Sequence, residues 1–512
     1  MNYRITCPYC FCEMDDEEVA FRSEVVHQGV PDFLPDEYDD VEDFNSRYRG
    51  EDKAELLDRL RDWYFFAEGT DDRYEMFWKE YNGTTEYNPA DAKFNVLAYR
   101  RKVIDPNNKA HQKYIKQQAD GSYYLRDEQG MANRIVLTTG EECSRRVCKE
   151  CHNPLPLNYG KNPIRFAAIV GITGSGKTVY LSQLLNKIKT YVSKVGLNTD
   201  RSGSVRTFVE NNAIVAGAPL PASTPQMRLQ QPLFFNLIKD EGNNKITTNT
   251  FVLYDVAGEV FTDEKLVDKF APFVRYANGI ITLIDPMQFE SISSVSDKGQ
   301  QLADATLVLE IIRSKITHGK DNEKCSTPIA ICLAKADIPV VQQVFSEKLK
   351  TCLLEDVKGD PDKTEFNALQ YAPVAEELSS FLKKNGTDLY SEMKKLYSNY
   401  AYFAFTALGC PVETEKDANG AEYQYPVGPV VPKRIEEPLL WLFYKLEYIG
   451  RNGDIPGEIV CPECGSPNST ELKGDDCYFT RREGFWGLRK QTYYANRECN
   501  NCGFKWDQKP ED

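Results

Sequence analysis

The chain has 512 residues, of which 41% are hydrophobic and 27% are charged, a composition typical of a globular protein with two or three domains. Its formal net charge of −15 disfavours broad, sequence-independent binding to nucleic acid or to an anionic membrane. The longest apolar runs fall far below the roughly 20 residues that cross a bilayer, and the stretch MNYRITCPYC has no apolar signal segment. We therefore expect a cytoplasmic protein without membrane contacts.

The N-terminal region, residues 1–160, contains two CxxC motifs that are separated by a long insertion at about residues 13–142. The insertion includes the acidic run DEYDDVED, which we interpret as a solvated loop. The stretches KAELLDRLRDWYFFAE and DDRYEMFWKEY predict two helices, and GSYYLRDEQGMANRIVLTTG alternates around turn glycines as a hairpin does. We therefore expect an inserted α+β domain.

The two CxxC motifs of this region predict a zinc ribbon. In a reducing cytoplasm, paired motifs of this kind indicate metal knuckles rather than disulfides. Four thiolates complete a closed tetrahedral zinc site, which has a structural and not a catalytic role. The expected ligands are Cys7, Cys10, Cys148 and Cys151, with Cys12, Cys143 and His152 as alternative ligands.

From residue 161 to about residue 452, short apolar strands alternate with longer helical segments, which predicts an α/β sheet covered on both faces. The strands are expected in RFAAIVGI, PLFFNLI, TFVLYDV, GIITLID, IAICLAK and YFAFTAL. Only the turn EGNNK separates LFFNLIKD from ITTNTFVLYD, so these two strands should pair antiparallel. The prediction is a mainly parallel sheet with one antiparallel edge strand, closed by an amphipathic helix in RIEEPLLWLFYKLEYIG.

The stretch GITGSGKT follows the strand RFAAIV and precedes a helical segment, which is the context that a phosphate-binding loop requires. Its glycines let successive backbone N–H groups point at a phosphate near the positive end of the helix. Lys177 is expected to bridge the β- and γ-phosphates, and the Thr178 hydroxyl to bind Mg²⁺. The expected loop residues are Gly171, Thr173, Gly174, Ser175, Gly176, Lys177 and Thr178.

A second phosphate-side motif, DVAGE, ends the strand TFVLYD. Asp255 is expected to hold Mg²⁺ through water, and Gly258 to offer its backbone N–H to a γ-phosphate. An aspartate and a glycine at this spacing are a weak signal alone, but here they close an apolar strand downstream of the phosphate loop.

Together with AKAD and TALG, these motifs resemble the P-loop GTPases of the translation-factor and Ras-like (TRAFAC) class over residues 164–450. The resemblance implies that a residue of the stretch PASTPQ, before the second strand, supplies the switch threonine and binds Mg²⁺. Thr224 is the expected residue, with Ser223 as its competitor.

The same resemblance assigns AKAD and TALG to guanine recognition. It implies that the aliphatic stem of Lys335 stacks on the base, and that Asp337 accepts hydrogen bonds from two guanine donors that adenine lacks on that edge. In the next motif, Thr406, Ala407 and Leu408, the backbone N–H of Ala407 is expected to donate to guanine O6. The chain departs from the class at Ala334, which lacks the side chain that ties this loop to the phosphate loop. GTP is the expected nucleotide, with ATP as the alternative.

A further departure is Glu259, which stands where Ras-like members often carry a glutamine that orients the attacking water. A carboxylate can accept a hydrogen bond from water, but it stands near a negatively charged phosphate. We therefore expect slow, partner-stimulated hydrolysis with Lys177, Thr224 and Glu259 as catalytic residues. No arginine finger is assigned among Arg201, Arg206, Arg228 and Arg275.

After the linker RNGDIPGE, residues 453–512 resemble a second zinc ribbon, whose expected ligands are Cys461, Cys464, Cys499 and Cys502. Its tip, YFTRREGFWGLRKQTYYANR, interleaves basic and aromatic side chains. Docking of a protein partner, a small structural core and binding of single-stranded nucleic acid are the alternatives for this tip, in that order of preference.

The layout as a whole, a GTPase-like domain between two zinc ribbons, most resembles the bacterial double-GTPase proteins of anti-phage systems. The resemblance implies a nucleotide switch that uses GTP, Mg²⁺ and two structural Zn²⁺ ions, with a second GTPase as its protein partner. The alternatives are a nucleotide-gated scaffold with negligible hydrolysis and an ATPase with a degenerate base site.

Overall fold

The computed structural model divides the chain into two compact units, residues 1–164 with 227–229 and residues 165–226 with 230–512. Each unit has a hydrophobic cluster of its own. The predicted division at about residues 160 and 452 into a ribbon region, a central domain and a second ribbon stays a prediction. The structure describes residues 3–24, 27, 46–50, 52–67, 69, 71–82, 101–156, 158–171, 174–222, 231–293, 305–320, 323–417, 420–464, 466–467, 469–472, 474–483 and 489–508.

The first unit consists of short sheets and helices. Strand β1 (Arg4–Thr6) pairs with β2 (Glu13–Asp15), β3 (Ala20–Arg22) lies between β4 (Val103–Ile104) and β8 (Arg145–Val147), and β6 (Ala132–Val136) lies between β5 (Leu125–Arg126) and β7 (Glu142–Cys143). Its helices are η1 (Asp16–Glu18), α2 (Lys53–Phe65), α3 (Asp72–Asn82) and α4 (Lys109–Gln112). Helices α2 and α3 and the antiparallel pair β5–β6 confirm the predicted helices and hairpin, and the acidic run DEYDDVED lies outside the described residues.

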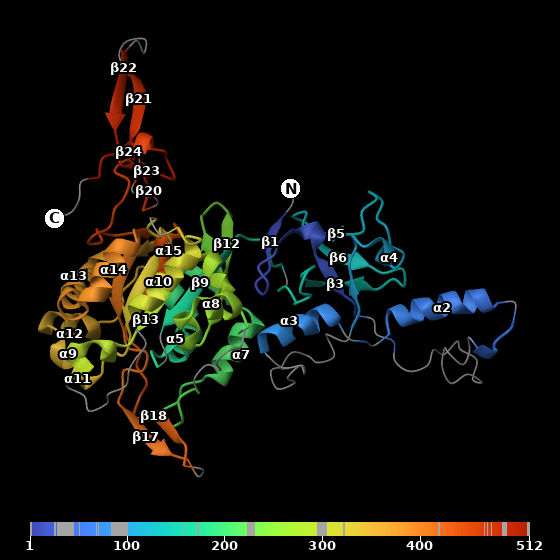
Figure 1. The fold of residues 1–512 in the computed structure, drawn as a ribbon, viewed down its shortest axis with the longest axis horizontal. Coiled ribbons are helices and arrows are strands. Elements are labelled where there is room, and N and C mark those ends of the chain that lie inside the picture. Colours follow the sequence, from blue (N-terminus) through green and yellow to red (C-terminus); the bar gives the residue numbers. More distant parts are fainter. Residues whose placement is uncertain are drawn as a thin grey trace. The chain divides into compact units, whose positions relative to one another are not determined.

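The second unit is organised around a seven-stranded sheet with the order β10-β11-β12-β9-β13-β14-β16 (Figure 1). The strands are β9 (Ile164–Gly171), β10 (Leu197–Arg201), β11 (Leu233–Asp240), β12 (Ile246–Asp255), β13 (Ala277–Ile284), β14 (Ile329–Leu333) and β16 (Tyr400–Ala404). All six predicted strands are confirmed, with β11 antiparallel to β12 and with β9, β13, β14 and β16 mutually parallel. Strand β10 was not predicted, and it pairs antiparallel with β11, so that β11 lies second from the edge.

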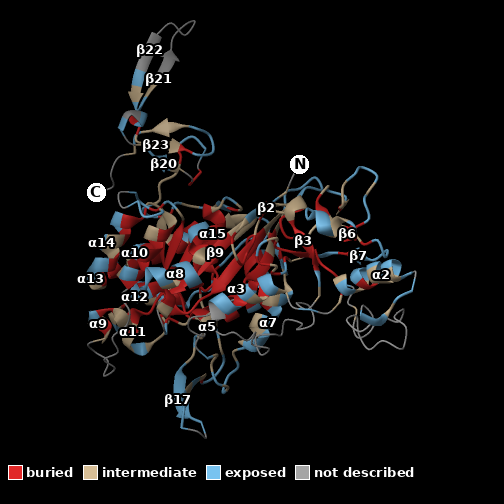
Figure 2. Ribbon diagram, turned by 45° about the vertical axis from the view of Figure 1, so that its right-hand side comes forward, coloured by how far each residue is buried: buried red, intermediate tan, exposed pale blue. Residues whose placement is uncertain are grey.

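Helices cover both faces of this sheet (Figure 1). They are α5 (Lys177–Asn186), α6 (Ile188–Ser193), α7 (Gly203–Asn211), α8 (Glu264–Phe270), α9 (Glu290–Ser293), α10 (Ala305–Ile316), α11 (Pro339–Val344), α12 (Glu347–Leu354), α13 (Ala368–Asn385), α14 (Thr387–Leu396) and α15 (Glu437–Lys445), with the 3-10 turns η2 (Gly258–Thr262), η3 (Pro272–Tyr276) and η4 (Pro286–Gln288). One continuous cluster joins side chains of α5, α13 and α15 to the sheet. Figure 2 shows that the buried residues concentrate in the sheet and in the helices that pack on it.

Helix α15 corrects one detail of the sequence prediction, because it is buried on all sides and not on one face only. Trp441 near its centre is 1% exposed and meets the ring of Phe403 at 5.7 Å. The charged end residues are tolerated because they are paired: Glu437 accepts from Arg434 Nε at 3.1 Å, and Lys445 Nζ lies 2.7 Å from a Glu458 oxygen.

The remaining strands of this unit form small sheets after or beside the main one. They are β15 (Glu365–Phe366) with β19 (Gly450–Arg451), the hairpin of β17 (Val412–Lys416) and β18 (Glu422–Pro426), the trio of β20 (Ser469–Glu471), β23 (Arg497–Cys499) and β24 (Lys505–Trp506), and the hairpin of β21 (Tyr478–Glu483) and β22 (Arg489–Tyr494), with η5 (Gly474–Cys477). No helix in the described ranges is long and apolar enough to span a bilayer.

The parallel strands determine where a site can form. Their carboxyl ends lie at one edge of the sheet, so the loops that follow β9, β13, β14 and β16 meet there. Backbone hydrogen bonds fasten these loops to one another: Ala334 donates to the carbonyl of Ile284 at 2.9 Å, and Ala336 donates to that of Phe405 at 3.2 Å.

Candidate functional site

The loop GITGSGKT connects β9 to α5, as the sequence predicts. A side chain at Gly171 would place its Cβ 2.6 Å from Ser175 Oγ and 2.7 Å from the Leu283 carbonyl oxygen, so only glycine fits where the strand ends. Gly174 and Gly176 have φ angles of +79° and +84°, in the left-handed region that favours glycine. Thr173 lies outside the described residues.

Lys177 is a buried cation at the first position of α5. Its side chain is 6% exposed, and Nζ donates to the Gly171 carbonyl oxygen at 2.8 Å. Burial lowers the pKa of Lys177 to about 8, although the nearby carboxylates of Asp255 and Glu259 raise it. An anion in the loop would therefore stabilise the protonated form of Lys177.

Thr178 and Asp255 form an oxygen pair beside this cation. The Thr178 hydroxyl donates to Asp255 Oδ2 at 3.0 Å, although the two residues come from different elements, α5 and the end of β12. A hydroxyl and a carboxylate are hard oxygen ligands, which is the donor type that Mg²⁺ prefers. The pair therefore fits a Mg²⁺ ion that also binds phosphate oxygens. Thr224 and its competitor Ser223 lie outside the described residues.

The two predicted base-recognition motifs lie side by side. AKAD follows β14 and TALG follows β16, and these two strands are neighbours in the sheet. The Thr406 hydroxyl accepts from the backbone N–H of Gly409 at 2.9 Å, and a Cβ at Gly409 would lie 2.0 Å from the Val431 carbonyl oxygen. The second loop is therefore tightly folded against the following segment.

A single cleft of about 1570 Å³ unites the predicted residues. Every described residue of the predicted nucleotide site lines this cleft except Gly171 and Asp255, which are the last residues of β9 and β12. Residues that are far apart in the sequence thus line one cleft, to which GITGSGKT, AKAD and TALG all contribute.

The sequence prediction missed the hairpin β17–β18, which also lines the cleft through Thr414, Glu422, Tyr423 and Gln424. The hairpin is tied to the segment before the predicted switch loop: Gly217 donates to the Pro426 carbonyl at 2.9 Å, and Leu220 to that of Gln424 at 2.7 Å. The signal that could have revealed it is the Asn-Gly dipeptide between the alternating stretches VETEK and EYQYP.

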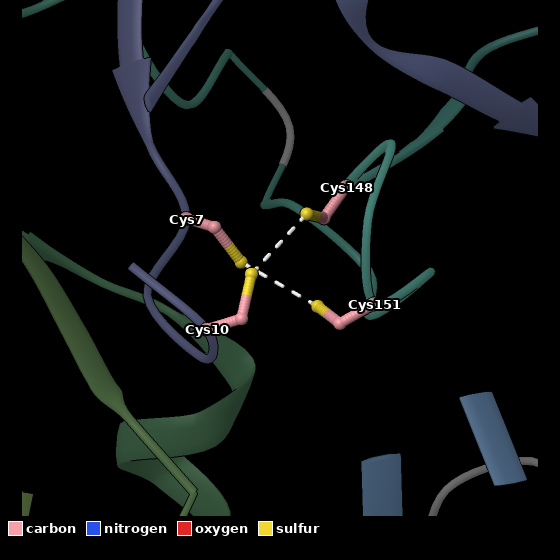
Figure 3. Close-up of side chains that lie close together, drawn as sticks. All are labelled: Cys7, Cys10, Cys148 and Cys151. Carbon is pink, nitrogen blue, oxygen red and sulfur yellow. Dashed lines mark hydrogen bonds between the residues drawn. The ribbon is translucent and has the colours of Figure 1, made fainter. Parts of the chain in front are cut away.

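The first group of cysteines is brought together from both ends of the first unit (Figure 3). The Sγ atoms of Cys7, Cys10, Cys148 and Cys151 all lie within 4.8 Å of one another, close enough to share one metal ion. Backbone N–H groups support them as in a knuckle, since Tyr9 donates to Cys7 Sγ and Glu150 to Cys148 Sγ, both at 3.4 Å.

The alternative ligands have other places. Cys12 Sγ lies 3.3 Å from Cys148 Sγ but is not one of the four mutually close thiols. Cys143 belongs to strand β7, and His152 Nδ1 lies 2.8 Å from Asp71 Oδ1. The geometry therefore favours the four cysteines that the sequence put first.

The second group, Cys461, Cys464, Cys499 and Cys502, meets the same criterion. Glu447, which follows α15, accepts from Ser466 Oγ and from Asn501 Nδ2, both at 2.6 Å, and so contacts both knuckles.

In the tip of this region, the rings of Phe479 and Tyr493 stack at 5.8 Å across the hairpin β21–β22. Phe485 and Trp486 lie outside the described residues.

Residues 165–388 match the Double-GTPase 2 family. This segment is similar to Double-GTPase 2 domains. It contains the phosphate loop, the Thr178–Asp255 pair and AKAD, whereas TALG and hairpin β17–β18 follow it in the chain. The family match therefore agrees with the GTPase-like fold that the sequence predicts.

The chain is also similar to a curated protein, "Putative ESX-1 scaffolding and assembly protein SaeC" of Mycolicibacterium smegmatis. The two are 25% identical over 225 residues, which is 42% of this chain and 53% of SaeC. The chain thus spans about half the length of that relative.

Three solved structures of proteins with bound GTP or GDP match part of the chain at low similarity. The GTP-bound GTPase-like domain of Ski7 from S. cerevisiae has a TM-score of 0.25 at 13% identity, covering 62% of this chain and 56% of that one. The signal recognition particle receptor SRb-GTP/SRX complex from Chaetomium thermophilum has a TM-score of 0.24 at 13% identity, covering 48% and 94%. Sup35 with GDP has a TM-score of 0.20 at 14% identity, covering 48% and 38%.

The two cysteine groups predict about two zinc ions per chain in protein purified without added zinc. Cys148→Ser should lower the content to about one, because it removes one thiolate from the first group only. Cys352→Ser, a partly buried cysteine outside both groups, is the control and should keep both ions. Elemental analysis measures the ratio, and less than one zinc per wild-type chain would contradict both sites.

The lowered pKa of Lys177 predicts that nucleoside triphosphate affinity falls as the pH rises through about 8. Phosphate stabilises the ammonium, so the protonated form binds; above pH 8 the free protein must take up a proton, and affinity should fall by up to about tenfold per pH unit. Calorimetry from pH 7.5 to 9.5 in buffers of different protonation enthalpy measures both the affinity and the proton uptake. Affinity that stays constant to pH 9.5 would contradict a phosphate-binding Lys177 that loses its proton near pH 8 in the free protein.

Proposed function

We propose that this chain is a GTP-binding protein and a slow, partner-stimulated GTPase that acts as a nucleotide switch. The observation that carries the proposal is the meeting of Lys177, Thr178 and the loops AKAD and TALG in one cleft, with Asp255 bonded to Thr178. The Double-GTPase 2 match of residues 165–388 supports it independently.

On the phosphate side, Lys177 binds the β- and γ-phosphates, and Thr178 and Asp255 hold Mg²⁺, with Thr224 as the expected third contributor. The metal ion, when bound, neutralises charge on the phosphate oxygens. The buried ammonium loses little entropy on binding, because its hydrogen bond to Gly171 already fixes its position. Gly258 lines the same cleft, where its backbone N–H suits a γ-phosphate.

Slow intrinsic hydrolysis follows from the residues around that phosphate. Glu259 lines the cleft at the position that would orient water, and its negative charge opposes the approach of a nucleophile to phosphate. The residues that line the described part of the cleft include no arginine. Arg201 is bonded to backbone carbonyls of α5 and Arg275 to Asp268, while Arg228 lies outside the described residues. A partner would therefore supply the missing positive charge, as arginine fingers do.

On the base side, Asp337 lines the cleft next to the TALG loop. A carboxylate there accepts from the two donors of guanine and finds none in the matching positions of adenine. Guanine selectivity is therefore the reading that the side-chain chemistry supports, and ATP is the competing nucleotide in the test below.

The resemblance to double-GTPase proteins supports a second GTPase as the partner and a setting in cytoplasmic anti-phage defence. The similarity to SaeC favours a second candidate, a nucleotide-gated scaffold that binds GTP, hydrolyses it negligibly and recruits proteins. The tip of the second ribbon, with its exposed Tyr478 and Tyr494, would then be a docking surface.

Asp337→Asn tests base recognition. The variant should bind GTP at least about tenfold more weakly than wild type does. Its preference should move towards xanthosine triphosphate, because the new amide donates a hydrogen bond where the carboxylate accepted one. Asp240→Asn, at the last residue of β11, is the matched control and should leave both affinities unchanged. Wild type that binds ATP at least as tightly as GTP, with no change in the variant, would exclude guanine recognition.

Multiple-turnover phosphate release separates the GTPase from the scaffold. Wild type should release phosphate from GTP slowly alone and at least about tenfold faster with the protein of a neighbouring GTPase gene, since an added arginine stabilises the transition state. Lys177→Ala should show neither rate. GTP binding without release above the Lys177→Ala background under both conditions would favour the scaffold.

A further inference from the structure

Asp285 is a buried carboxylate directly after β13 that no motif of the sequence points to. It is 4% exposed, and its two oxygens have different partners. Oδ1 accepts from the backbone N–H of Met287 at 3.0 Å, which caps the turn η4. Oδ2 lies 2.6 Å from Nζ of Lys335, the lysine of AKAD. One carboxylate thus joins the end of β13 to the base-recognition loop.

Lys335 needs such a partner for two reasons. Its φ angle is +54°, a left-handed backbone that a lysine seldom adopts and that persists only where surrounding contacts impose it. The preceding Ala334 is 2% exposed and has no polar side chain, so it can tie the loop only through its backbone N–H, to the carbonyl of Ile284. Residue 334 gives the loop no side-chain hydrogen bond, so the ion pair between Lys335 and Asp285 anchors the loop instead.

The pair also controls which charges face the cleft. The Lys335 side chain is 37% exposed and the Asp285 side chain 6%, so the ammonium is drawn towards the sheet while the aliphatic stem stays accessible. An ammonium held by Asp285 is not available to neutralise Asp337, two residues further on, which also lines the cleft. Asp337 then keeps its full capacity to accept hydrogen bonds.

We infer that Asp285 is a positioning residue for base selection, which fixes Lys335 so that its stem lies against the base and Asp337 remains free to accept from it. The inference rests on the proposed guanine recognition and names a determinant of it outside the two motifs. Asp285 itself lies behind the loop and does not line the cleft, so it acts through Lys335.

The test compares GTP and ATP affinities of the full-length chain in four forms: wild type, Asp285→Asn, Lys335→Met and the double variant. Asp285→Asn keeps the oxygen that caps η4 and removes the charge that holds Lys335. Lys335→Met keeps an aliphatic stem without an ammonium. Asp240→Asn is the control, because it makes the same change in a carboxylate that accepts from the backbone N–H of Gly242 and has no lysine of the cleft as partner.

Asp285→Asn should lower the affinity for GTP about tenfold and keep the affinity for ATP within about twofold of wild type. The GTP-to-ATP affinity ratio should therefore fall. The double variant should bind GTP no more weakly than Lys335→Met, because both changes remove the same interaction. A carboxylate that only stabilises the fold would instead lower GTP and ATP affinity together, along with the melting temperature of the nucleotide-free chain.

The GTP and ATP affinities of wild type and Asp285→Asn together decide whether Asp285 acts in base selection. If wild type prefers GTP and Asp285→Asn keeps the same GTP-to-ATP affinity ratio, the role of Asp285 is overturned and guanine recognition stands. This holds whether the variant loses no affinity or loses it equally for both nucleotides. Wild type without any preference for GTP overturns guanine recognition and the role of Asp285 together.

Discussion

Burial of the Lys177 ammonium is the constraint around which the cleft is arranged. The lysine begins α5 and is held against the carbonyl of Gly171, where its hydration is largely lost and its pKa falls. Asp255 and Glu259 raise that pKa only in part, so an anion in the loop would stabilise the ammonium further. The left-handed turns at Gly174 and Gly176 serve the same end, because they curl the backbone around the space in front of the ammonium.

The parallel sheet determines what else this space can contact. Strands β9, β13, β14 and β16 deliver their following loops to one edge, so that Asp285, Lys335 and Thr406 meet although long segments separate them in the chain. Hydrogen bonds between neighbouring loops, such as that from Ala336 to Phe405, join AKAD and TALG into one connected structure. The loops that line the cleft are thus brought together by a single topological feature.

Much of this arrangement could be predicted from the sequence, because it depends on local patterns. Apolar runs marked six strands, and GITGSGKT, DVAGE, AKAD and TALG marked their loops. Strand β10 escaped prediction because LNTDR has a single aliphatic residue and gains its partner only through β11. Asp285 escaped because an aspartate after a strand is ordinary until the lysine of another loop is seen 2.6 Å away. The four ligands of the first cysteine group likewise depend on the tertiary fold. The spacing of the residues alone left six cysteines and one histidine as candidates.

The backbone ladder between hairpin β17–β18 and the segment 217–220 has a consequence for the cost of binding in the cleft. Gly217 and Leu220 donate to carbonyl groups of the hairpin, and Pro219 and Leu220 line the cleft. A wall that hydrogen bonds already hold in place has little conformational entropy left to lose when a ligand enters. More of the contact energy therefore remains as net binding free energy.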